Sequence, residues 1–178
     1  MKKFIIALIA ISLPLFGFSQ SAFDKFEDSE NVGSVTISKG MLKIAAEMMD
    51  NHGDKDTQDF VDLAKNLDGI KIFMSEDDGA SADMQATMKQ YVKKSRLDEL
   101  MKIKDGDTNL KFYIKNGKDD DHVSELLMFV TGIEDEKGRK ANIETVLLSM
   151  TGDIDLTKVG SLTEKMRLPK HLKKAERN

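Results

Sequence analysis

The spacing of apolar residues changes at Asp98, and no other feature of the chain constrains its fold as strongly. Before this point apolar residues recur every three or four positions, as on one face of a helix, and after it they alternate with polar ones, as in strands. Four strand segments are predicted there: 100–104, 110–115, 123–131 and 143–151. Because consecutive strands joined by short loops usually pair, this half predicts an antiparallel meander. The run 123–131 is apolar on both faces, which predicts a central strand.

The first half predicts two short strands, 34–38 and 70–74, and three helices. We expect the first helix to pack into the core through a stripe of apolar residues at helical spacing: Met41, Ile44, Ala45, Met48 and Met49. Segment 57–67 and a helix that begins at Ser81 show the same spacing. A final helix, capped by Asp155, would carry Leu156, Val159, Leu162 and Met166 on one stripe. The prediction is an α+β domain, a mainly antiparallel sheet with helices packed on one face.

The N-terminus has the pattern of a secretory signal peptide. Two lysines precede residues 4–18, which carry no charge, and this run is shorter than the roughly 20 residues that a membrane-spanning helix needs. Gly17 and Ser19 are small residues at the spacing that signal peptidase requires, so cleavage is expected after Ser19, with Gln20 as the near alternative. We therefore expect residues 1–19 to be a signal peptide and the product to be periplasmic or extracellular.

The chain contains no cysteine, which restricts how an exported product can be held. It forms no disulfide, and its N-terminus cannot carry a thioether lipid, so it should not be lipid-anchored. Residues 20–167 are long enough for one domain with its own core, and residues 168–178 form a basic tail.

Charge is unevenly distributed along the chain. After removal of the signal segment 25 basic and 31 acidic residues remain, and the end of the chain from Lys165 carries a net +5 while the part before it carries −11. A body this acidic argues against nucleic-acid binding. Contact with a membrane is expected only through the basic tail, which is more simply a solvated terminus.

Three stretches together carry a family resemblance: VTISKGMLKIAAEMM at 35–49, VSELLMFVTG at 123–132 and VLLSMTGDIDL at 146–156. They resemble the DUF4252 family of exported proteins of unknown function, found mainly in Bacteroidetes. The resemblance spans roughly residues 21–167 and implies export and the extent of the fold. It implies no catalytic residue.

Two acidic segments are candidate sites. Asp105, Asp107 and Asn109 match the first three ligand positions of a calcium-binding loop, but the glycine and glutamate positions are occupied by Leu110 and Asn116. A hairpin turn is the better interpretation. The cluster 119–121 is expected at the opposite end of the sheet.

Asp153 and Asp155, beside Gly152, could hold a metal or act as a general base. We instead expect Asp155 to cap the last helix and Asp153 to add a favourable charge there.

No other motif indicates a reaction. The histidines at 52, 122 and 171 lack metal-ligand spacing, Ser149 lacks a G-x-S-x-G motif, and the methionines coincide with core stripes. We predict no catalytic, cofactor-binding or metal-binding residue. The leading hypothesis is a non-enzymatic binding module with an envelope protein partner; the alternatives are a hydrolase-like enzyme with an acidic-loop site and a calcium or small-ligand carrier.

Overall fold

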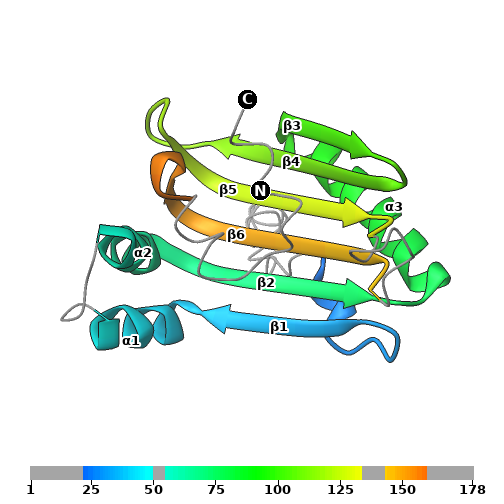
Figure 1. Ribbon diagram of the computed structural model, residues 1–178, viewed down its shortest axis with the longest axis horizontal. Coiled ribbons are helices and arrows are strands. Elements are labelled where there is room, and N and C mark those ends of the chain that lie inside the picture. The colour runs from blue at the N-terminus through cyan, green and yellow to red at the C-terminus, as the bar shows by residue number, and fades with distance from the viewer. Residues whose placement is uncertain (1–21, 50–54, 134–142, 160–178) are drawn as a thin grey trace, which may run out of the picture.

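The computed structural model describes residues 22–49, 55–133 and 143–159 (Figure 1). Strand β1 (Gly33–Ser38) is followed by helices α1 (Lys39–Met49) and α2 (Lys55–Asn66), strand β2 (Leu67–Ser75) and helix α3 (Asp78–Ser95). The chain continues through β3 (Asp98–Asp105), β4 (Thr108–Asn116), β5 (His122–Thr131) and β6 (Thr145–Asp155). Short 3₁₀ turns precede β1 (η2, Asp24–Phe26) and follow β6 (η3, Leu156–Lys158).

The strands form one six-stranded antiparallel sheet in the order β1-β2-β6-β5-β4-β3. This confirms the α+β class and the predicted meander, because the last four strands neighbour one another in chain order. It also confirms a central position for β5. The two N-terminal strands extend the sheet on the other side of β6.

Helices cover both faces of the sheet, so the expectation of one covered face is wrong. Leu42, Val61 and Met128 share a core cluster on the face of α1 and α2, whereas Met84 and Phe129 share a second cluster on the face of α3. In Figure 1, α1 and α2 lie together at one end of the sheet and α3 lies behind the strands. The central strands are apolar on both sides, and each side needs its own cover.

The N-terminal segment helps α3 to cover the second face. Phe23 and Phe26 are buried there and contact the Phe73 ring at centroid distances of 6.5 and 5.9 Å. Tilted and edge-on ring pairs at this separation are favourable. This aromatic contact supplies part of the packing that a cysteine-free domain must provide without disulfides.

Two expected element boundaries are wrong. Asp77, rather than Ser81, caps α3, and its side chain accepts a hydrogen bond from the Ala80 N–H at 2.7 Å. Strand β6 continues through Gly152 to Asp155, so the acidic stretch belongs to the strand. Of the expected final helix only residues 156–159 lie within the described part of the chain, and Leu156–Lys158 form a 3₁₀ turn. No helix in the described part of the chain is long and apolar enough to cross a membrane.

The exposed face of α1 is a further difference from the prediction. Leu42 and Ala46 are buried, whereas Met41, Ile44 and Met48 are 57, 54 and 74% exposed. We call these three residues the α1 stripe. They were expected in the core because their spacing is helical, but α1 lies at the edge of the sheet, where only one of its two apolar faces packs against other described elements.

Candidate functional site

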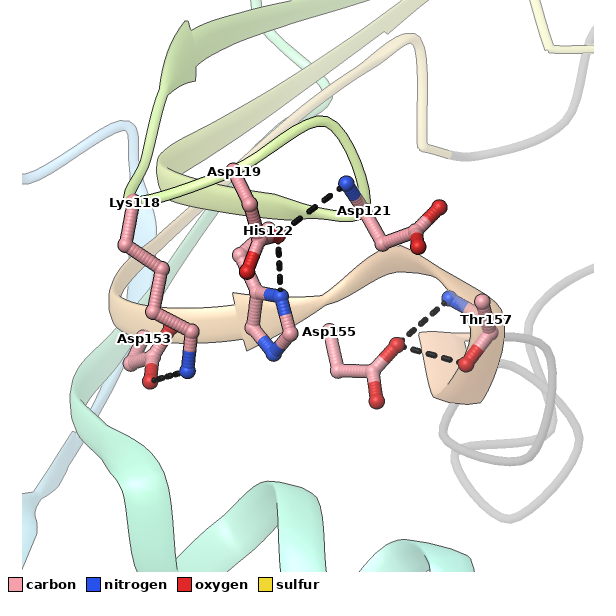
Figure 2. A network of polar contacts seen from close by, with 7 residues as sticks. All are labelled: Lys118, Asp119, Asp121, His122, Asp153, Asp155 and Thr157. Carbon is pink, nitrogen blue, oxygen red and sulfur yellow. Dashed lines mark hydrogen bonds and ion pairs between the residues drawn. The ribbon is translucent and has the colours of Figure 1, made fainter.

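The structure gathers the second acidic segment at one end of the sheet (Figure 2). The β4–β5 loop lies beside the end of β6, where His122 is paired with Asp155 across the two strands. The backbone fixes this arrangement, since the Leu156 N–H donates to the Asp121 carbonyl at 2.9 Å. We call the loop 117–122 together with 153–157 the acidic end.

Three carboxylates at the acidic end are each held by a structural partner. Asp153 Oδ2 lies 2.7 Å from Lys118 Nζ, and Asp119 Oδ1 lies 2.6 Å from His122 Nδ1. Asp155 accepts the Thr157 N–H at 2.9 Å and so caps η3, as expected from the sequence. Asp153 was expected to add a favourable negative charge at the start of the last helix, but it lies in β6 and forms an ion pair with Lys118.

The electrostatics of the acidic end favour ionised carboxylates. The hydrogen bond from His122 lowers the pKa of Asp119, and the Thr157 hydroxyl lowers the pKa of Asp155. Catalytic carboxyl groups that donate a proton near neutral pH usually have a raised pKa. The arrangement therefore suits a capped, ion-paired loop better than acid–base chemistry.

The first acidic segment is a hairpin turn. Asp105 pairs with Thr108 across the β3–β4 turn, Gly106 has a φ of 57°, and the Asn109 side chain donates to the Asp107 carbonyl at 3.0 Å. The following residues run along β4 and cannot wrap round an ion. Clusters of three or more histidine or acidic residues able to hold a metal are absent from the described ranges.

The three histidines and Ser149 lie in different places. His122 belongs to the acidic end, whereas His52 and His171 lie outside the described residues. Ser149 is buried on β6, opposite Lys71 of β2. Ser149 and Lys71 line a cavity of ≈ 300 Å³, together with Asp24, Thr36 and Thr151.

A buried carboxylate was missed by the sequence analysis. Glu125 lies on β5 with 6% exposure; its Oε2 accepts the Tyr91 hydroxyl at 3.0 Å, and its Oε1 has no hydrogen-bond partner among the described residues. Burial raises the pKa of Glu125, and it raises the pKa of Tyr91 to about 12. The sequence signal for this residue is a single acidic residue within an otherwise apolar strand. The spacing of apolar residues alone does not reveal that such a residue is buried.

Comparison with known proteins identifies a family. A family model described as a domain of unknown function (DUF4252) matches residues 26–162. No curated protein and no solved structure matches the chain.

Proposed function

Because the chain belongs to the DUF4252 family of domains of unknown function, we propose a function from its own surface: it is an exported, non-enzymatic module that binds a protein partner in the cell envelope. The exposed α1 stripe carries this proposal. Leu42 and Ala46 already provide the buried face of α1, so the fold itself does not require three further large apolar side chains in solvent.

The chemistry of the stripe suits a protein surface. Its residues stand at positions i, i+3 and i+7 of one helix and present a continuous apolar face. Methionine side chains are flexible and adapt to an uneven apolar partner. Val35 on β1 is also 43% exposed, so the apolar surface is not confined to the helix. Exposed apolar residues gathered in this way are typical of interaction sites.

The test compares a triple variant and a double variant of helix α1. Replacement of Met41, Ile44 and Met48 by Gln keeps helix propensity and removes the apolar face, whereas Lys43→Gln with Glu47→Gln changes exposed charges of the same helix. Both variants should unfold within a few degrees of the wild type, since exposed substitutions change stability by about 0.5 kcal/mol or less.

Capture from envelope extracts then separates the outcomes. We expect the mature wild type and the charge variant to retain one reproducible protein that the stripe variant loses. Capture that is empty, or equal for all three proteins, would contradict the proposal.

A further inference from the structure

The two edges of the sheet are protected to different degrees. An edge strand exposes backbone donors and acceptors that can pair with another strand, and proteins usually block this with charges, prolines or bulges. Edge strand β3 has such protection: five of its eight residues are charged, and its register is broken between Glu99 and Met101. Edge strand β1, with the sequence GSVTIS, has no charge, no proline and an unbroken register with β2.

Strand β1 is also complementary to itself. Val35 and Ile37 lie on one face, and three hydroxyl residues lie on the other: Ser34, Thr36 and Ser38. Two antiparallel copies related by a two-fold axis at Thr36 would place Val35 opposite Ile37 and Ser34 opposite Ser38. A shift of one residue would instead set Val35 against Thr36 and mix the faces. A two-fold axis at Val35 or at Ile37 would keep the faces apart but set one apolar residue against Gly33 or Lys39, so only the axis at Thr36 pairs every apolar residue of the strand with another.

We propose that the bound partner is a second copy of this chain, whose β1 pairs antiparallel with β1 about a two-fold axis at Thr36. The two sheets then join into one continuous sheet, and the interface uses the same surface on both copies. This inference rests on the proposed function, because it names the partner. Helix α1 begins at Lys39, directly after β1, and lies along the same border of the molecule as that strand (Figure 1).

Single cysteines test the register, because the chain has none of its own. In Thr36→Cys the two Cα atoms would face each other directly, at about 4.5–5.5 Å, which a disulfide can span. In the matched variant Ser34→Cys they would stand four residues apart along the strands, about 13 Å, which it cannot. On mild oxidation of the mature protein we expect at least tenfold more cross-linked dimer from Thr36→Cys than from Ser34→Cys.

A charge variant tests the same edge without cross-linking. Thr36→Lys would place two like charges opposite each other at the axis, and edge lysines oppose pairing. In sedimentation equilibrium we expect the wild type to dimerise and Thr36→Lys to weaken dimerisation at least tenfold. Met101→Lys adds the same charge to the β3 edge, where the side chain is 38% exposed, and should sediment as the wild type. Circular dichroism establishes that each variant is folded.

The inference and the proposed function fail in different ways. A wild type that is monomeric at every concentration tested, or equal cross-linking of the two cysteine variants, would overturn the second copy as the partner. If such a monomer still captured an envelope protein through the α1 stripe, the proposed function would stand with another partner. If it captured nothing, both would fall.

Discussion

At the scale of single residues, Glu125 is the only charged side chain that is buried in the described part of the chain. Its carboxylate faces the α3 side of the sheet and receives one hydrogen bond, from Tyr91. Burial of a carboxylate that lacks a full set of donors costs free energy, and that cost falls on the ionised form. The free energy of unfolding should therefore depend on pH through this residue.

Glu125→Gln should raise the melting temperature at pH 7–8. Because burial raises the pKa of Glu125 in the folded protein above its ordinary value of 4.5, the wild type bears the cost of a buried charge once the pH exceeds the folded-state pKa. The difference between variant and wild type should shrink as the pH falls through that pKa toward 4.5. Thermal unfolding over this range measures it, and a difference that does not vary with pH would contradict the burial argument.

Tyr91→Phe should destabilise the protein by about 1–3 kcal/mol at neutral pH, because it removes the hydrogen bond that the Tyr91 hydroxyl donates to the buried Glu125 carboxylate. The loss should be smaller in the Glu125→Gln background, where no charge remains to be solvated. A double-mutant cycle from chemical denaturation gives the coupling between the two side chains. Equal losses in the two backgrounds would show that the hydroxyl acts elsewhere.

At the scale of elements, the end of β6 depends on Gly152. It has a φ of 134° and lies where the pairing of β6 with β2 and β5 is irregular. An added Cβ would lie 2.6 Å from the Asn66 carbonyl oxygen and 2.7 Å from Leu67 Cα, and neither backbone atom can move cheaply. The glycine therefore sets how closely β6 approaches the junction of α2 and β2.

Gly152→Ala should lower the free energy of unfolding by more than about 2 kcal/mol, through both the clash and the strained backbone. Gly40→Ala is the matched control. Its nearest contact would be Ser38 Oγ at 3.9 Å, and it lies in α1, so it should stabilise the protein by about 0.5–1 kcal/mol. Urea unfolding of both variants tests the contrast; a mild effect at Gly152 would mean that the strand end rearranges readily.

The acidic end separates the binding module from the enzyme alternative. Asp155→Ala should cost about 1 kcal/mol because η3 loses its cap, whereas Asp153→Ala removes an exposed ion pair and should cost at most about 0.5 kcal/mol. An enzyme that uses these carboxylates would lose turnover in Asp153→Ala while its stability stayed near that of the wild type. A hydrolase substrate screen of the wild type with no turnover would favour the binding module.

At the scale of the whole molecule, export remains a prediction that a mass measurement can test. Cleavage after Ser19 should give a cell-envelope or secreted product that begins at Gln20 and carries no lipid. Intact mass spectrometry of the protein isolated from its native host distinguishes this product from the uncleaved chain. A mass that includes residues 1–19 would show that the segment is retained.

The sequence by itself determined the class of the fold and its main order. Period-two segments after Asp98 implied four strands, and short loops implied that these strands pair in order, because both rules depend on local spacing. The hairpin at Asp105–Asp107 and the cap at Asp155 were predictable for the same reason: turn and cap preferences act over a few residues.

Only the tertiary structure decided which surfaces are buried. Helical spacing could not say which of the two apolar faces of α1 meets the sheet, so Met41, Ile44 and Met48 were assigned to the core although they are exposed. Period counting also could not place β1 at an edge or set Glu125 against Tyr91. These features depend on contacts between segments far apart in the chain, and the packing of the whole sheet settles them.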